Sequence, residues 1–112
     1  MNNNITDKKE FLQFSAYKFN KGKIISSHKH LLKKKIPKLI KIQESWVIIS
    51  GSVKVFFYDT DNKFLCKKIL KKGDASISFA GGHKLEVLEN KTKIYEYKNG
   101  PYEGSNNDLQ YF

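Results

Sequence analysis

Apolar and polar residues alternate with a period of two along most of the chain. This alternation is typical of β-strands that bury one face and expose the other. Turn residues, mostly Gly, Asn and Asp, separate the alternating runs. The expected strands are residues 11–19, 23–27, 46–49, 52–58, 64–70, 75–79, 84–88 and 92–98. Many short strands with regular turns predict an all-β antiparallel sandwich or barrel.

Three segments depart from this pattern. Residues 1–10 contain no apolar stretch, so we expect a short, frayed N-terminal tail rather than a secretory signal. Residues 31–41 have some helical character, but Pro37 interrupts it, which favours a loop or an edge strand. Residues 105–112 end in two aromatic side chains, so we expect them to pack on the barrel or on a partner subunit. Residues 11–104 would form the single domain.

Composition narrows the class of protein. The chain has 112 residues with 8 Phe, 6 Tyr and 1 Trp, enough for one core without disulfides. Cys66 is the single cysteine, which excludes an internal disulfide and suits a reducing cytoplasm; we expect it to be a small buried side chain. No apolar run approaches the roughly 20 residues needed to span a bilayer. We therefore expect a cytoplasmic protein with no membrane partner.

The formal net charge of +10 raises the question of nucleic-acid binding. All 21 basic residues are Lys, whereas base-edge and bidentate phosphate recognition rely heavily on Arg. The lysines are also spread along the chain and often alternate with apolar residues. We therefore expect a solvated basic surface and no nucleic-acid partner, although a positive field would attract a small anionic ligand.

All three histidines fall where they can meet. His28 and His30 are two residues apart on an extended segment, so both side chains point to one face. His83 follows a Gly-Gly bend that can bring a third imidazole in from a neighbouring strand. Glu44 begins the strand that contains Trp46. Three imidazoles and one carboxylate suit Fe, Mn, Ni, Co, Cu or Zn, and not Ca or Mg.

The spacing of these residues resembles that of a small single-domain cupin. Residues 22–30 match the start of the first cupin motif, which is a Gly, five intervening residues and then His-x-His, and residues 44–51 match its Glu-to-Gly end. Residues 73–83 fit the second motif, from Gly-Asp to a Gly-then-His turn. The resemblance covers roughly residues 18–102 and implies a double-stranded β-helix, or jelly-roll, barrel. It also implies that a divalent transition metal (Fe, Mn, Ni or Zn) is bound by His28, His30, Glu44 and His83.

Two departures from the cupin pattern bear on the site. Thirteen residues separate His30 from Glu44, instead of the few that are usual, although a longer loop need not move the start of the next strand. Phe79 stands where proline is usual, and His83 comes one residue early. Residues 96–104 resemble the closing segment of small bacterial cupins that are often associated with surface-polysaccharide genes.

Glu96 is a further candidate for catalysis, together with His30. It lies between Tyr95 and Tyr97 in an expected strand, so either the carboxylate or the two tyrosines face the interior. An inward Glu96 would be an acid or base, and an outward one would pair with a lysine. The outward orientation is slightly favoured. Aromatic residues that would belong to the core or wall a pocket are Tyr17, Trp46 and Phe57.

Three functions remain open at this stage. The first is a metal-dependent enzyme or binding protein for a small polar molecule, sugar-like or a carboxylate. The second is a metal-free enzyme resembling the nucleotide-sugar ketoisomerases, with His28 and His30 as acid and base. The third is a ligand-binding cupin without catalytic activity. For each, the resemblance implies a homodimer, since small cupins often pair by exchanging edge strands, and such pairing hides the backbone groups of barrel edges.

Overall fold

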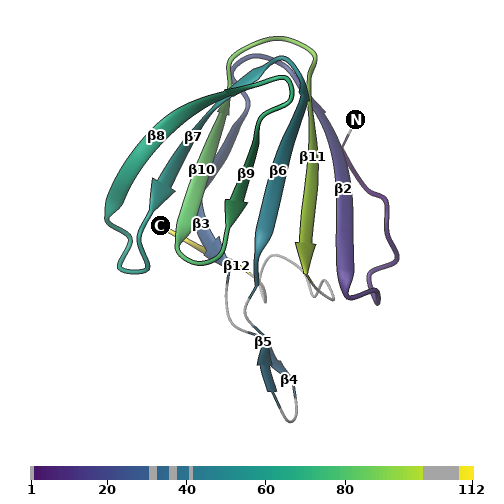
Figure 1. Cartoon of the computed structure of the whole chain (residues 1–112), viewed down its shortest axis with the longest axis vertical. Helices are drawn as coiled ribbons and strands as arrows, with labels where there is room; N and C mark the ends of the chain where they lie inside the picture. The colour runs from purple at the N-terminus through teal and green to yellow at the C-terminus, as the bar shows by residue number, and fades with distance from the viewer. Residues whose placement is uncertain (1, 31–32, 36–37, 41, 100–108) are drawn as a thin grey trace.

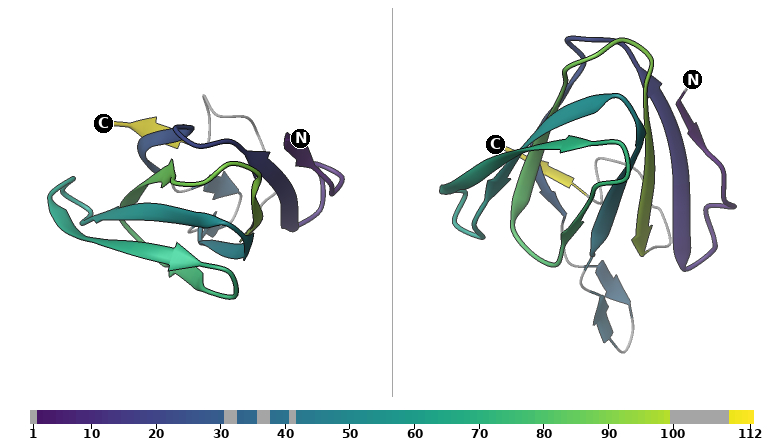
Figure 2. Two further views of the ribbon diagram at one scale, coloured as in Figure 1. Left: turned by 90° about the horizontal axis from the view of Figure 1, so that it is seen from above. Right: turned by 45° about the horizontal axis from the view of Figure 1, so that its top comes forward.

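The computed structural model describes residues 2–30, 33–35, 38–40, 42–99 and 109–112, with the backbone alone at 2–3, 30, 33–35, 38–40 and 109–111. Two five-stranded antiparallel sheets pack face to face, which confirms the all-β jelly-roll prediction (Figures 1 and 2). Sheet A has the order β1 (Asn2–Asn4), β2 (Leu12–Phe19), β11 (Thr92–Asn99), β6 (Glu44–Ser50) and β9 (Ala75–Ser78). Sheet B has the order β12 (Leu109–Tyr111), β3 (Ile24–His30), β10 (Gly82–Val87), β7 (Ser52–Tyr58) and β8 (Phe64–Lys71).

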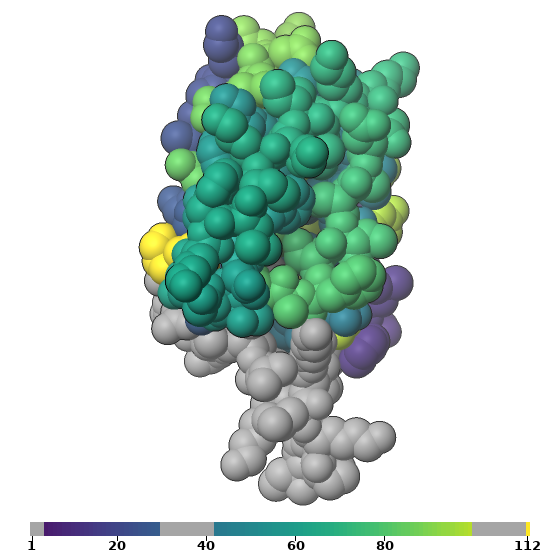
Figure 3. Space-filling view, turned by 60° about the vertical axis from the view of Figure 1, so that its left-hand side comes forward, coloured from purple at the N-terminus to yellow at the C-terminus, as the bar shows by residue number. Residues whose placement is uncertain are grey.

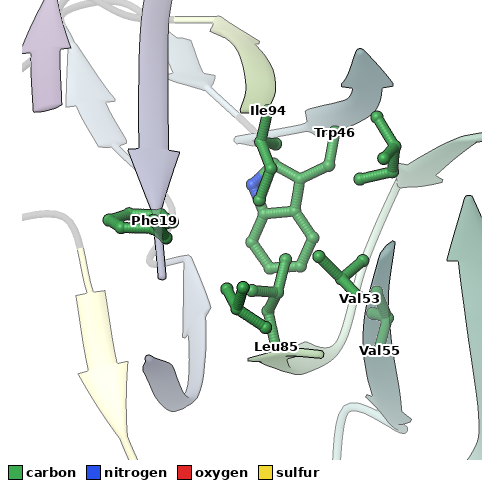
Figure 4. Close-up of a cluster of buried hydrophobic side chains, with 8 residues drawn as sticks. Phe19, Trp46, Val53, Val55, Leu85 and Ile94 are labelled. Carbon is green, nitrogen blue, oxygen red and sulfur yellow. The ribbon is translucent and has the colours of Figure 1, made fainter. Parts of the chain in front are cut away.

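The core lies between the two sheets and is built from alternate residues of their strands (Figure 4). Burying each such side chain stabilises the fold by about 1.5–3 kcal/mol relative to leaving it in water. The same alternation that predicted the strands therefore also produces the core. Its buried members are Phe19, Trp46, Ile48, Val53, Val55, Leu85, Val87 and Ile94.

The N-terminal segment is not the expected frayed tail. Strand β1 pairs with residues 15–17 of β2, and Gln13, whose side chain is 1% exposed, connects the intervening loop to the barrel. The Gln13 amide donates to the carbonyl oxygens of Asp7 and Glu10 and accepts from the Thr6 hydroxyl. The tail prediction was wrong because strand pairing uses backbone groups, which a polar segment offers as well as an apolar one.

The segment between the expected metal ligands forms a separate hairpin among the described residues. Strands β4 (Lys33–Lys35) and β5 (Lys38–Ile40) pair with each other and project below the two sheets in Figure 1. Pro37 lies outside the described residues. At the other end of the chain, β12 pairs with residues 28–30 of β3, and the ring of Phe112 packs edge-on against Tyr58, with centroids 5.0 Å apart.

Strand β8 is an edge strand of sheet B, and its side chains are exposed except for a half-buried Leu70. Cys66 is therefore exposed, contrary to the expectation that it is buried. It pairs with Phe57 of β7, but β8 is the edge strand of its sheet and Cys66 is not among the residues that form the core. Figure 3 shows this side of the molecule, where the teal and green segments around β8 form the surface. The part of the chain that is described contains no helix able to span a membrane.

We expect Gly51→Ala to destabilise the fold more than Gly73→Ala. Both glycines have positive φ, 81° and 90°, which costs an alanine about 1–2 kcal/mol. A Cβ on Gly51 would also lie 2.9 Å from the Cα of Thr92, whereas one on Gly73 would have nothing within 4 Å. Urea unfolding measures the free energy of unfolding of both variants. Gly73→Ala reports the backbone cost alone, so the additional loss in Gly51→Ala reports the steric overlap. Equal losses would contradict the close approach of Gly51 to β11.

Candidate metal centre

Three buried polar side chains meet between the two sheets. His28 comes from β3, His83 from the neighbouring strand β10 and Glu44 from the first residue of β6 in the opposite sheet. These residues are only 4%, 2% and 5% exposed. One ligand atom from each lies within 4.8 Å of the others, so a single ion can contact all three.

The distances within the group match those between ligands of one ion. The Nε2 atoms of His28 and His83 are 3.1 Å apart, and His83 Nε2 lies 3.1 Å from Glu44 Oε1. Two nitrogens that each lie about 2.1 Å from a metal at a right angle are about 3.0 Å apart. The donor atoms of His28 and Glu44 are therefore each spaced from His83 Nε2 as neighbouring ligands of one ion are.

Hydrogen bonds on the far side of each imidazole orient the ligand nitrogens. His28 Nδ1 lies 2.7 Å from the carbonyl oxygen of Ser26. A carbonyl only accepts, so Nδ1 carries the proton and the Nε2 lone pair of the neutral ring points into the site. His83 Nδ1 lies 3.1 Å from the hydroxyl of Ser78. Such outer partners fix the ring orientation of metal-binding histidines.

Trp46 connects the histidines to the second acidic group of the interior. Its ring stacks on His83, with centroids 4.1 Å apart and 19° between the planes. Its indole Nε1 donates a hydrogen bond of 2.8 Å to Glu96 Oε2. Trp46 is only 2% exposed, so it holds His83 on one side and Glu96 on the other within a rigid core.

Glu96 faces the interior and is 9% exposed, while Tyr95 and Tyr97 face outward. The slightly favoured outward orientation of Glu96 was therefore wrong. The physical reason is the buried indole N–H of Trp46, which needs an acceptor and finds it in this carboxylate. The hydroxyl of Tyr17 also donates to Glu96, over 3.3 Å.

The environment of Tyr17 raises its pKa above the usual value of 10.0. Burial is the main cause, and the negative charges of Glu96 and Glu44 add to it. Since the ionised phenolate is disfavoured, Tyr17 remains a hydrogen-bond donor to Glu96 over the whole neutral pH range. The interior therefore contains a carboxylate and a protonated hydroxyl in direct contact.

This raised pKa predicts a loss of stability at high pH. Above about pH 10 the unfolded chain releases the Tyr17 proton while the folded chain keeps it, so the free energy of unfolding falls as pH rises. In Tyr17→Phe we expect a shallower decline above pH 10, because this titration is absent. Urea unfolding of both proteins between pH 8 and about 11 measures the two slopes. Parallel slopes would contradict the raised pKa.

The structure brings together three of the four metal ligands expected from the sequence, and Glu44 is among them despite the long preceding segment. The backbone of His30 continues β3 and pairs with Leu109 of β12, but its side chain lies outside the described residues. Sequence reasoning missed Ser26 and Ser78 as partners of the histidines. The signal for Ser78 was the alternation of β9, which places a serine rather than an apolar residue on its inner face.

Neither a protein-family model nor a curated protein matches the chain. Several solved structures do match it. The structure of KdgF from Halomonas sp. is 16% identical with a TM-score of 0.70, and the match covers 91% of this chain and 80% of that one. An uncharacterised conserved protein with a double-stranded β-helix domain from Klebsiella pneumoniae is 15% identical with a TM-score of 0.70, covering 99% and 82%.

Oxalate decarboxylase from Bacillus subtilis is 20% identical with a TM-score of 0.70 over 92% of this chain. The match covers 24% of the decarboxylase chain, so this protein spans about a quarter of that enzyme's length. Similarity at this level of identity shows the fold. The two face-to-face antiparallel sheets and these neighbours together show that the chain has the cupin fold, a double-stranded β-helix.

Proposed function

We propose that the protein is a metal-dependent cupin that binds one divalent transition ion through His28, Glu44 and His83. The observation that carries the proposal is the convergence of two imidazole nitrogens and one carboxylate oxygen in a buried position. Two histidines and one carboxylate suit Fe, Mn, Ni or Zn better than Ca or Mg. His30 is the fourth ligand that the cupin resemblance implies, and its backbone continues β3 two residues after His28.

The bound ion would supply Lewis acidity and a template for the oxygens of a small polar molecule. Glu96 would accept and donate protons in the same interior, and Tyr17 would orient it as a hydrogen-bond donor. Polar side chains face the interior from β2 as well, where Gln13 and Ser15 are buried. We propose a small sugar-like or carboxylate ligand, and the net charge of +10 would favour an anionic one.

One structural neighbour supports this choice of ion and ligand. A structure of the Bacillus subtilis oxalate decarboxylase comes from work on its Mn(II) centres, and the name of that enzyme specifies a dicarboxylate. The match is 20% identical. On the strength of these Mn(II) centres and that name, Mn is the first ion to test and a carboxylate is the first ligand. His30 and Glu96 are the residues we propose for catalysis if the ligand is converted.

The same contacts suggest a second candidate function. A separation of 3.1 Å between His28 Nε2 and His83 Nε2 is also a hydrogen-bond distance, so a shared proton could take the place of an ion. The pair would then act as acid and base on a ligand, as in the metal-free isomerase alternative. The two functions differ in whether the site takes up a transition metal.

Metal binding can be followed through the single tryptophan of the chain, since Trp46 stacks on His83. We expect Co²⁺ or Ni²⁺, whose partly filled d shells quench nearby indoles, to quench the fluorescence with saturation at one equivalent. Glu44→Ala should weaken the response, because it removes the only carboxylate of the three-residue group. Glu86→Ala on the outer face of β10 is the matched control and should respond like the wild type. Quenching without saturation, or identical curves for both variants, would refute metal binding at this site.

A further inference from the structure

The strand that carries His28 has a β-bulge directly before this residue. The register of β3 against β10 shifts by one residue between His28 and Ile25, and the extra residue is on β3, where Ser26 and Ser27 together lie opposite Lys84. His28 is buried and Ile25 packs against the core, although the two are an odd number of positions apart. In a regular strand such residues would face opposite sides of the sheet. The bulge is therefore what turns the His28 imidazole into the metal site.

The backbone of the bulge finds its partners outside the regular ladder. A bulge interrupts strand pairing, so its carbonyl and N–H groups need other donors and acceptors. The carbonyl oxygen of Ser26 accepts from His28 Nδ1, over 2.7 Å. The carbonyl oxygen of Ser27 accepts from the backbone N–H of Phe112, over 3.1 Å. This second bond extends the pairing of β12 with β3 by one residue beyond Tyr111, so the C-terminal segment reaches the bulge itself (Figure 1).

The ring of Phe112 adds contacts on the outer face of sheet B. It packs edge-on against Tyr58 of β7, and the hydroxyl of Ser27 donates to that of Tyr58 over 3.3 Å. The ring also lies over Gly82 of β10. A Cβ on Gly82 would be 2.5 Å from Phe112 Cζ and 2.7 Å from the carbonyl oxygen of His28. Phe112 therefore contacts both histidine-bearing strands of this sheet, β3 through its backbone and β10 through its ring.

This contact explains why residue 82 is a glycine. Gly81 has a φ of 82°, which favours glycine, but Gly82 has no positive φ. Glycine inside a strand often marks the close approach of another part of the chain. At Gly82 the approaching group is the Phe112 ring, so β10 leaves space for this ring next to His83. Phe112 is 41% exposed and does not belong to the core, so its contacts bear on the two strands rather than on core packing.

We propose that Phe112 is a positioning residue for His28, because it holds the bulge of β3 in the register that aims the imidazole into the site. The inference rests on the proposed function, since it gives the C-terminal segment a part in the same metal centre. A shift of one residue would turn His28 to the outer face of the sheet. A smaller movement of the bulge would separate His28 Nε2 from His83 Nε2, which lies 3.1 Å away. Loss of Phe112 therefore weakens the metal site without unfolding the barrel.

Histidine NMR of the metal-free protein tests the placement of His28. Long-range ¹H–¹⁵N spectra distinguish the two tautomers of a neutral imidazole, and the chain has three histidines to assign. We expect the Nδ1–H tautomer of His28 in the wild type, because Nδ1 donates to the carbonyl of Ser26. Phe112→Ala removes the ring, and Phe112→Pro also removes the backbone N–H. The signals of His28 should move toward a mixture of tautomers in Phe112→Ala and further in Phe112→Pro.

Phe64→Ala is the matched control for the loss of an aromatic ring. Phe64 packs edge-on against the same Tyr58, with centroids 5.9 Å apart, but it belongs to β8, which pairs with neither β3 nor β10. Its removal takes an aromatic partner from Tyr58 and leaves the contacts of the bulge in place. The His28 signals of this variant should therefore match those of the wild type. Far-UV circular dichroism verifies that each variant is folded.

Calorimetric titration with Zn²⁺ measures the consequence for the metal site. We expect Phe112→Ala to lower the affinity by about 10-fold, at the lower end of the effects of outer partners, and Phe64→Ala to leave it unchanged. The proposal is overturned if Phe112→Pro keeps the wild-type signals of His28, or if Phe64→Ala disturbs them equally. It is also overturned if the wild type binds Zn²⁺ and Phe112→Pro binds it as tightly. If the wild type takes up no metal, the proposed function fails, and the His28 signals still decide whether Phe112 positions this residue.

Discussion

His83→Ala is expected to lower the affinity for a transition metal by about 1000-fold, more than the roughly 10- to 100-fold that the loss of an outer partner costs. The reason is the central position of His83 Nε2, which lies 3.1 Å from both His28 Nε2 and Glu44 Oε1. Without it, His28 and Glu44, the other two described ligands, lie in opposite sheets. Isothermal titration calorimetry of metal-free protein with Mn²⁺ and Zn²⁺ measures the change.

Ser78→Ala provides the graded control for this loss. It removes the hydroxyl 3.1 Å from His83 Nδ1 but keeps all three ligand side chains. We expect an affinity between those of the wild type and His83→Ala, within the range of outer-partner effects. If the affinity of His83→Ala equalled that of the wild type, the metal would have to bind elsewhere on the chain.

Trp46→Ala is expected to cost about 3–5 kcal/mol in the free energy of unfolding. The side chain is one of the largest in the core, and its removal leaves a cavity beside His83. It also removes the N–H that donates to Glu96. Since a domain of this size is stable by about 5–15 kcal/mol, the loss is a large part of the total. Urea unfolding followed by far-UV circular dichroism measures it without relying on the fluorescence of Trp46.

Trp46→Phe separates packing from hydrogen bonding at this position. Phenylalanine keeps a ring in the core but cannot donate to Glu96, so we expect a loss of about 1–3 kcal/mol. In the double variant Trp46→Phe with Glu96→Gln, part of this loss should return, because a neutral amide costs less to bury than a carboxylate. No recovery in the double variant would show that the Trp46–Glu96 contact contributes little to stability.

The strands could be predicted from the sequence because they depend on local alternation. Residues 52–58 were predicted with the bounds that the structure shows, and most other strands differ by one or two residues at their ends. The prediction placed Glu44 beside the histidines even though thirteen residues precede it after His30. Pairing of Glu44 with Lys98 and Ser78 in sheet A fixes its position, whatever the length of the preceding segment.

Other features depend on contacts between distant residues and could not be predicted locally. The alternation at Tyr95-Glu96-Tyr97 fits either orientation, and a shift of one residue reverses every side chain. The Trp46 indole, 50 residues away in sequence, fixes the choice. The pairing of β1 depends on the hydrogen bonds of Gln13 to residues 6, 7 and 10. Exposure of Cys66 follows from the position of β8 at the edge of its sheet.

The most direct test of the metal site is elemental analysis of protein purified without a histidine tag. We expect close to one transition metal ion per chain in the wild type, and its loss in both His28→Ala and Glu44→Ala. Loss in His28→Ala alone would remove Glu44 from the set of ligands. Absence of metal from the wild type, even after incubation with Fe, Mn, Ni or Zn salts, would contradict the proposed function.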